Sequence, residues 1–216
     1  MIKKSLIFIF IVFFALIASA TADRNEKLAG LEKRIADYQV NPAFKDDAMG
    51  FGVVKSALES IQEGSGGIGA CLVDKSSGRI VAYGRNRQTS PYFRSDLHAE
   101  MDLLNRYEDR VKKGNDAKTR KNPRECKNLV LVTSVEPCPM CLTRIINSGI
   151  KTVRYMVEDK AGGMVTRLDH LPPFWREFAA DRKFLQADCS PELRQIALDL
   201  FNFSSRNFAQ NRQKNK

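Results

Sequence analysis

Two short motifs constrain this chain more than any other feature: His98-Ala99-Glu100 and Pro137-Cys138-Pro139-Met140-Cys141, which lie within 44 residues of each other. A catalytic zinc site needs three protein ligands and one open position, and His98, Cys138 and Cys141 supply one neutral and two anionic ligands of suitable kinds. Two cysteines three residues apart at the start of a helix place their sulfur atoms on one face. The positive end of that helix favours their ionised form. The spacing therefore predicts a fold that brings the two motifs around one metal ion.

The residues around the motifs carry a resemblance to a known family. They read H-A-E-M at 98–101 and T-S-V-E-P-C-P-M-C-L at 133–142, which together give the pattern H-x-E…P-C-x-x-C. The chain thereby resembles the zinc-dependent nucleobase deaminases of the cytidine deaminase-like superfamily, most closely the guanine deaminase and tRNA adenosine deaminase branch. The resemblance implies an α/β fold, a three-layer α/β/α sandwich with a mixed sheet of about five strands.

The same resemblance implies a role for each site residue. One Zn²⁺ per chain is expected on His98, Cys138 and Cys141, with a zinc hydroxide that attacks the amine-bearing carbon of the substrate ring. Glu100 matches the family's proton shuttle, which serves the ring nitrogen and the departing ammonia. Asn86 and the backbone amide of Ala99 match positions that bind the base in related enzymes.

Other side chains near these motifs have ordinary structural interpretations as well. Asn86 could be a turn residue, and Glu100 a solvated helix glutamate. Glu136 is predicted to brace the loop before Cys138, and His170 is a lone loop histidine. Four aromatic residues could stack on a flat ring or simply pack: Tyr92, Phe93, Phe174 and Trp175.

The favoured function is hydrolytic deamination of a free nucleobase or nucleoside, a purine such as guanine first, by a protein that is expected to form a homodimer as related enzymes do. A polynucleotide deaminase of the tRNA or toxin type is the alternative with the same chemistry. A non-catalytic zinc-binding protein would need a fourth protein ligand, such as Cys126 or His170. A secreted thiol redox module would use Cys138 and Cys141 but would leave His98 and Glu100 without a role.

Residues 1–22 have the pattern of a signal peptide. A basic start is followed by an apolar run from Leu6 to Ile17 and by small residues that suit cleavage near Ala20 or Ala22. The run is shorter than the roughly 20 residues that span a bilayer, so no membrane span is expected after cleavage. An uncleaved anchor is the alternative. The pattern predicts an exported protein, periplasmic or secreted.

The charge balance is basic but mixed. The chain has 35 Lys and Arg against 25 Asp and Glu, and removal of Lys3 and Lys4 with residues 1–22 lowers the net charge from +10 to +8. Basic clusters lie at 118–121 and 206–216. A net positive charge of this size can serve solubility as well as the binding of a polyanion, so it does not by itself indicate a nucleic-acid partner. Nucleic acid is therefore a less favoured partner than a small molecule.

Hydrophobic periodicity predicts the elements along the chain. Residues 23–45 form a helical extension, 46–203 the deaminase domain with its C-terminal helices, and 204–216 a basic disordered tail. Within them we expect helices over 25–38, 49–63, 98–111, 138–147, 173–180 and 191–203, and strands over 68–74, 79–85, 128–133 and 150–157. Cys71 is expected in the core, and a bond between Cys126 and Cys189 stays open.

Overall fold

The computed structural model describes residues 21–113 and 123–214, with side chains over 21–111 and 126–204. The chain divides into two compact units, residues 1–38 and 39–216. The described part of the first unit is one helix over 21–37, where the sequence predicts a helix from 25. The predicted signal peptide lies almost wholly outside the described residues. Among the described helices, none is long and apolar enough to span a membrane.

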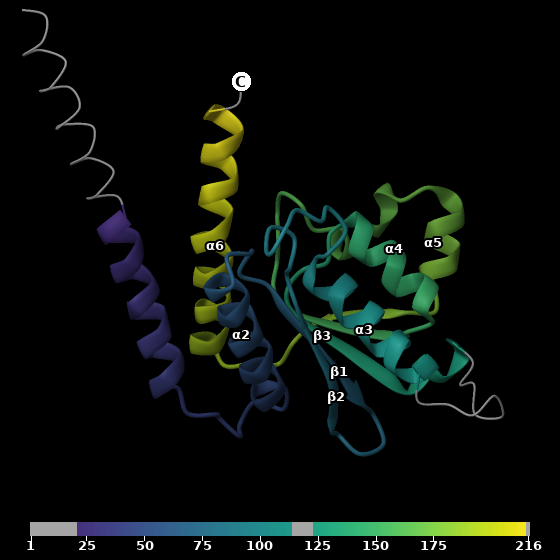
Figure 1. Ribbon diagram of the computed structural model, residues 1–216. Coiled ribbons are helices and arrows are strands. Elements are labelled where there is room, and N and C mark those ends of the chain that lie inside the picture. The colour runs from purple at the N-terminus through teal and green to yellow at the C-terminus, as the bar shows by residue number, and fades with distance from the viewer. Residues whose placement is uncertain (1–20, 114–122, 215–216) are drawn as a thin grey trace, which may run out of the picture. The chain divides into compact units, whose positions relative to one another are not determined.

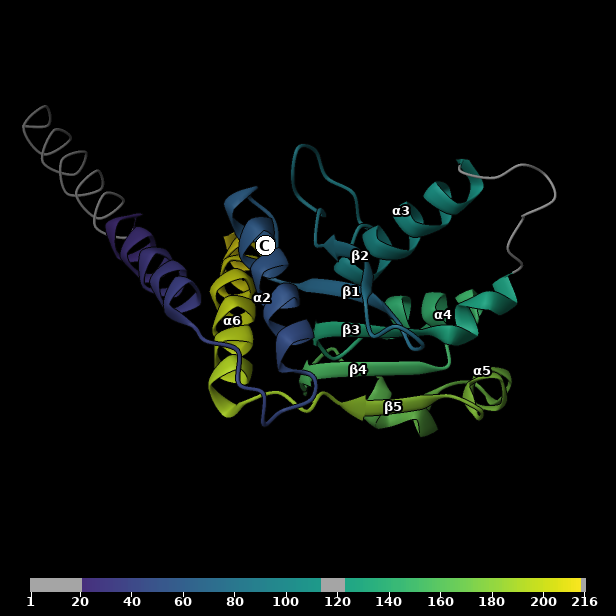
Figure 2. The ribbon, with the colours of Figure 1, turned by 90° about the horizontal axis from the view of Figure 1, so that it is seen from below.

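The second unit is built around one mixed sheet of five strands, as expected (Figures 1 and 2). The strand order is β2-β1-β3-β4-β5. β1 is antiparallel to β2 and to β3, whereas β3, β4 and β5 run parallel. The strands are β1 (Gly69–Asp74), β2 (Ile80–Arg85), β3 (Leu129–Val135), β4 (Thr152–Val157) and β5 (Lys183–Gln186).

Helices cover both faces of this sheet. α2 and α6 pack on one face and α3 and α4 on the other, with α5 beside α4 (Figure 1). The helices are α2 (Asp47–Gln62), α3 (Ala99–Lys113), α4 (Pro139–Ser148), α5 (Pro173–Ala179) and α6 (Pro191–Lys214), and two 3-10 helices are η2 (Pro123–Asn128) and η3 (Val165–His170). All seven residues of β3 are buried, because an apolar strand in the middle of such a sheet is covered on both sides.

The main elements lie where the periodicity predicts them. α4 ends at Gly149, whose φ of 83° is the left-handed cap that glycine favours. Shortly before α3, the carboxylate of Asp96 pairs with Arg94. Cys71 is buried in β1, as expected, and the Cys189 thiol donates to the carbonyl of Asp46, so Cys189 is not bonded to Cys126.

The prediction of a disordered segment over 204–216 is wrong for most of its length. α6 continues to Lys214, because no glycine or proline follows Pro191 and the sequence there is rich in Arg, Gln and Lys, which favour helix. The sequence does not predict β5. This strand has four residues, most of them exposed, so it lacks the apolar run from which a strand is predicted.

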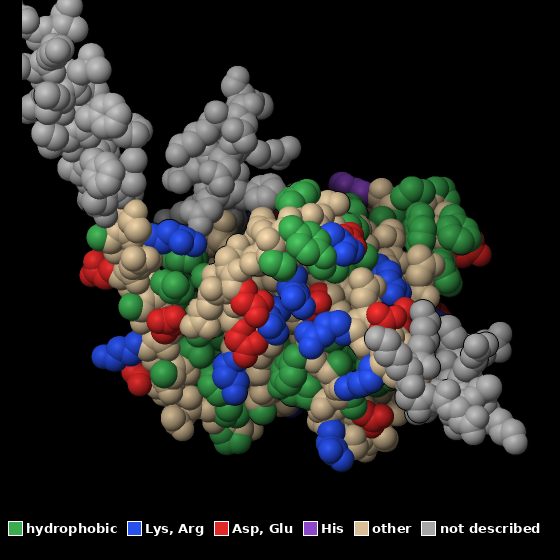
Figure 3. Space-filling model, in the orientation of Figure 1, with side chains coloured by type: hydrophobic (Ala, Val, Ile, Leu, Met, Phe, Trp, Pro, Cys, Tyr) green, Lys and Arg blue, Asp and Glu red, His purple; other side chains and the backbone are tan. Residues whose placement is uncertain are grey.

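On the face drawn in Figure 3, Lys and Arg side chains are interspersed with Asp and Glu, and neither sign of charge forms a continuous patch. Exposed hydrophobic side chains gather over α5. There Phe174 and Phe178 are exposed, and their rings lie 5.7 Å apart between centroids.

Candidate metal centre and substrate site

The two motifs meet where the first turns of α3 and α4 come together. His98 directly precedes α3, and Cys138 is the N-cap residue of α4 with Pro139 after it. Proline suits the first helical position because its missing N–H has no partner there in any case. The ligand atoms of His98, Cys138 and Cys141 all lie within 4.8 Å of one another, and Cys138 Sγ is 3.6 Å from His98 Nδ1. The structure therefore brings together the three residues that the spacing selects.

This donor set fits a zinc ion. Two sulfurs and one imidazole nitrogen are ligands that zinc prefers. In the part of the chain that the structure describes, the group consists of these three residues, without Cys126 or His170. Cys126 packs against the hydrophobic core, and the exposed His170 faces Asp169 at 3.6 Å. Three protein ligands with no fourth leave a position for water, which is the arrangement of catalytic zinc sites and not of structural ones.

The two thiols differ in acidity, because the Cys141 thiol donates a hydrogen bond to Cys138. A hydrogen bond from the Cys141 thiol, together with one from His98, lowers the pKa of Cys138 to about 4. The same bond to the Cys138 thiolate, with burial, raises the pKa of Cys141 well above its ordinary value. The hydrogen bond to Cys138 also raises the pKa of His98. A metal ion replaces such protons when it binds, because thiolate and neutral imidazole are the ligand forms.

Glu100 lies next to this group in the first turn of α3, and it is not the solvated helix glutamate of the alternative interpretation. Its carboxyl is buried, and burial raises its pKa. Thr133 on β3 donates a hydrogen bond to its Oε1 at 3.2 Å. A carboxyl group of raised pKa can both accept and return a proton near neutral pH.

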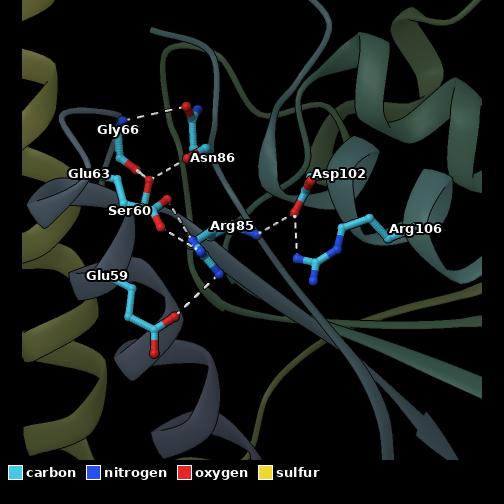
Figure 4. A network of polar contacts seen from close by, with 8 residues as sticks. All are labelled: Glu59, Ser60, Glu63, Gly66, Arg85, Asn86, Asp102 and Arg106. Atoms are coloured by element: carbon cyan, nitrogen blue, oxygen red, sulfur yellow. Dashed lines mark hydrogen bonds and ion pairs between the residues drawn. The ribbon is translucent and has the colours of Figure 1, made fainter. Parts of the chain in front are cut away.

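Asn86 follows β2 and is 4% exposed, with every backbone group engaged. Its N–H donates to the carbonyl of Ile68, and its own carbonyl accepts from Ser60. Its side-chain Oδ1 accepts from the N–H of Gln88 at 2.9 Å. It also accepts from the N–H of Gly66 at 3.4 Å (Figure 4). Two backbone donors fix which way the amide faces. No described residue accepts from its side-chain NH₂, which therefore remains able to donate.

A comparison with protein families decides the assignment of this site. The model of the cytidine and deoxycytidylate deaminase zinc-binding region matches residues 46–157, which is half of the chain. The chain belongs to this deaminase family. It is therefore a zinc-dependent hydrolytic deaminase that acts on a nucleobase or nucleoside moiety, as the motifs predict.

Solved structures share the fold of this deaminase. A structure from work on tRNA:A34 deaminases, which edit A to I at the wobble position of transfer RNA, is 21% identical with a TM-score of 0.51, and the match covers 68% of this chain and 94% of that one. A guanine deaminase from Nitrosomonas europaea is 21% identical with a TM-score of 0.50, covering 72% and 82%. A protein solved with 2,6-diaminopurine is 22% identical with a TM-score of 0.53, covering 78% and 84%. A search of curated proteins found no significant match.

The other residues singled out in the sequence lie in different places in the deaminase. Ala99 is buried as the first residue of α3, where its N–H has no acceptor within the helix. Tyr92 and Phe93 are exposed in the loop between β2 and α3. Trp175 packs against a hydrophobic cluster that includes Leu142 and Ile146 of α4. Glu136 is buried and accepts from Asp159 N, Thr166 N and Thr166 Oγ1. Its role is therefore structural, but the loop that it braces is the one after β4 and not the loop before Cys138 that the sequence predicts.

Three residues at the site carry no sequence signal of their own. Thr133 holds Glu100, Ser60 holds Asn86, and Asp102 holds the end of β2. Each is an ordinary polar residue in a helix or strand. Only the folded chain shows that its partner is a site residue or the neighbour of one.

Proposed function

We propose that this deaminase hydrolyses the amine from a free nucleobase or nucleoside, with a purine such as guanine as the favoured substrate. The observation that carries the proposal is the group of three ligands with the buried carboxyl of Glu100 beside it. His98, Cys138 and Cys141 would hold the zinc ion. When bound, zinc lowers the pKa of a coordinated water from about 15.7 to about 7.

The chain's own residues then manage protons and orientation. Glu100 takes a proton from the attacking water and delivers it to the ring nitrogen next to the amine-bearing carbon. It later helps to protonate the amine, which leaves as ammonia, so that water is consumed and a carbonyl replaces the amine. The raised pKa of Glu100, which burial causes, suits this exchange in both directions.

Asn86 and Ala99 would bind the ring. The Oδ1 atom of Asn86 is occupied by two backbone N–H groups, so the side chain offers a donor to the substrate. The backbone N–H of Ala99 at the start of α3 offers a second donor. Two donors suit a ring with acceptor atoms such as the carbonyl oxygen or ring nitrogens of a purine.

The structural relatives support a purine. They include a guanine deaminase, a protein solved with 2,6-diaminopurine and a structure from work on A-to-I editing by tRNA:A34 deaminases.

The test is ammonia release by the purified protein of known zinc content, with guanine, adenine, cytosine and their nucleosides. Glu100→Gln should keep one zinc per chain and lose activity, because the amide cannot take up the proton. Glu177→Gln, an exposed change of the same kind on α5, is the matched control and should retain full activity. Activity of Glu100→Gln equal to that of the control would overturn the mechanism.

A polynucleotide substrate is the second candidate, favoured by the net charge of +10 and by the fold shared with tRNA:A34 deaminases. It predicts activity on tRNA or single-stranded nucleic acid, with binding that weakens steeply as salt rises. Deleting residues 206–216 would then reduce binding. A zinc-loaded protein that is inert on every small molecule and active on a polynucleotide would establish this candidate instead.

We also propose that the protein is exported and acts as a homodimer. The support for export is the pattern of residues 1–22. Mass spectrometry of the protein recovered outside the cytoplasm should give an N-terminus after Ala20 or Ala22, whereas an intact Met1 would contradict cleavage. Light scattering of the purified protein should give twice the mass of one chain, and the mass of a single chain would contradict the dimer.

A further inference from the structure

The chain at the end of β2 is held against the start of α3 at three neighbouring places. The first is Gly84, where a Cβ atom would lie 2.6 Å from the carbonyl oxygen of Ala99 and 2.5 Å from Leu103 Cβ. Glycine is thus required for the helix to approach the strand this closely. The third is Arg87, whose N–H donates to the carbonyl of Leu97 at 2.9 Å.

The second place is the hydrogen bond between Arg85 and Asp102. β2 is an edge strand, so part of its backbone N–H groups have no strand partner. The N–H of Arg85 donates to Oδ2 of Asp102 at 3.3 Å, and Asp102 is 4% exposed (Figure 4). The same oxygen lies 3.5 Å from the guanidinium of Arg106. Asp102 therefore links strand and helix through a buried carboxylate.

The two ends of this link carry the groups that meet the substrate in the proposed function. Asp102 is two residues after Glu100 in the same helical turn, and Arg85 directly precedes Asn86. On the far side of the strand, Asn86 is held by Ser60 of α2. The side chain of Arg85 is held by Glu59 of α2 and by Glu63, the C-cap residue of that helix. The chain at 85–86 is thus fixed between α2 and α3, and its link to α3 is the bond to Asp102.

We propose that Asp102 is a positioning residue for deamination, which sets the register of Glu100 relative to Asn86. The proposal rests on the proposed roles of those two residues. Asp102 acts through the backbone of Arg85 and does not touch the ring. Its buried hydrogen bond keeps the proton carrier on the helix and the ring-binding amide after the strand at a constant separation.

The test compares two variants of Asp102 with a control. Asp102→Ala removes the acceptor, and kcat should fall about 10-fold to 100-fold, the size expected when reacting groups shift by up to about 1 Å. KM should change much less, because Asn86 remains held by Ser60, Gly66 and Gln88. Asp102→Asn keeps an oxygen that can accept from Arg85 and should restore most of kcat. Asp109→Asn, an exposed change of the same kind on α3, is the matched control and should leave kcat unchanged.

Two further readouts separate positioning from a general loss of structure. Zinc content should stay at one per chain in each variant. Hydrogen exchange at the Arg85 backbone N–H should accelerate in Asp102→Ala but not in Asp102→Asn. If Asp102→Ala does not fold, Asp102→Glu is used instead. The glutamate carboxylate lies one methylene farther from the backbone, so this variant should have a lower kcat and still bind zinc.

The results distinguish this inference from the proposed function. A wild-type kcat in Asp102→Ala, with Glu100→Gln inactive, would overturn the positioning role and leave the function standing. Equal losses in Asp102→Ala and Asp102→Asn would also overturn it, because charge and not the hydrogen bond would then matter. An active Glu100→Gln would instead remove the function on which the inference rests.

Discussion

The hydroxyl of Thr133 lies 3.2 Å from Oε1 of Glu100, and both side chains are buried. The same hydroxyl is 3.4 Å from the carbonyl of Gly69. It has one hydrogen to donate, and the shorter contact to a carboxylate is the stronger bond. Thr133 thus orients the group proposed to carry the proton.

Replacing Thr133 by valine should therefore lower kcat, because valine has the same shape and no donor. The free energy of unfolding should fall by about 1–3 kcal/mol if the Glu100 oxygen is left without a partner. Steady-state kinetics and urea denaturation measure the two effects. Thr133→Ser keeps the hydroxyl and should stay near wild type in kcat, and a fully active Thr133→Val would contradict the orienting role.

Glu136 should prove structural and not catalytic. Its carboxylate accepts three hydrogen bonds, from Asp159 and twice from Thr166, while a glutamine has only one accepting atom. Glu136→Gln should therefore destabilise the protein by about 1–3 kcal/mol, through a buried group left unsatisfied. Thermal unfolding is the measurement, and the exposed Glu158→Gln nearby is the control. An unchanged unfolding temperature would show that these bonds do not brace the loop.

Arg154 and Asp46 form an ion pair between β4 and the start of α2. Asp46 is 1% exposed and also accepts from the N–H of Asp188 at 2.9 Å. Arg154→Ala leaves this buried carboxylate without its cation and should cost about 3–5 kcal/mol in the free energy of unfolding. Lys45→Ala breaks the exposed pair with Asp188 in the same region and should cost less than about 1 kcal/mol. Similar losses in the two variants would mean that solvent screens the buried pair.

The elements that the sequence predicts well are those with a local signal. β3 has a continuous apolar run, α4 has a proline at its start and a glycine at its end, and both lie within two residues of the expected bounds. β5 lacks such a signal, since its place depends on parallel pairing with β4. The charge and amides of the tail after Ser204 favour disorder, but the tail has no Gly or Pro, which permits α6 to continue to Lys214.

The same distinction holds within the site. His98, Cys138, Cys141 and Glu100 form a pattern of residue types and spacings that the chemistry requires, so sequence finds them. Asp102 has a role at the site because it bonds to Arg85, which is 17 residues away in the sequence. Thr133 has one because it bonds to Glu100, which is 33 residues away. Such pairs arise only when the sheet and helices assemble, and no local pattern marks them.

Removing zinc should destabilise the protein as well as inactivate it. An ion that binds the folded chain and not the unfolded one adds its binding free energy to stability. A chelator should lower the unfolding temperature, and added zinc should restore it. His98→Ala should bind no zinc and ignore the chelator, while His170→Ala, which changes a histidine outside the ligand group, should keep one zinc per chain. Zinc lost from both variants would point to a different ligand set.

The hydrogen bonds of Asp74 should make the stability of the turn between β1 and β2 depend on pH. Hydrogen bonds from the hydroxyl and N–H groups of Ser76 and Ser77 lower the pKa of Asp74 from 3.8 to about 2. The pKa of Asp74 is lower in the folded protein than in the unfolded chain. The ionised carboxylate therefore stabilises the folded protein above pH 3.8, and this stabilisation is lost as the pH falls towards 2. Asp74→Asn lacks this titration, so the wild type should be the more stable protein at pH 5 and lose its advantage by pH 2.

Urea denaturation of the two metal-free proteins at several pH values measures that difference without the proton-linked loss of zinc. Salt should have little part in the effect, because the partners of the Asp74 carboxylate are neutral hydroxyl and amide groups. A stability gap between wild type and Asp74→Asn that stays constant from pH 5 to pH 2 would show that the ionised carboxylate does not hold the turn.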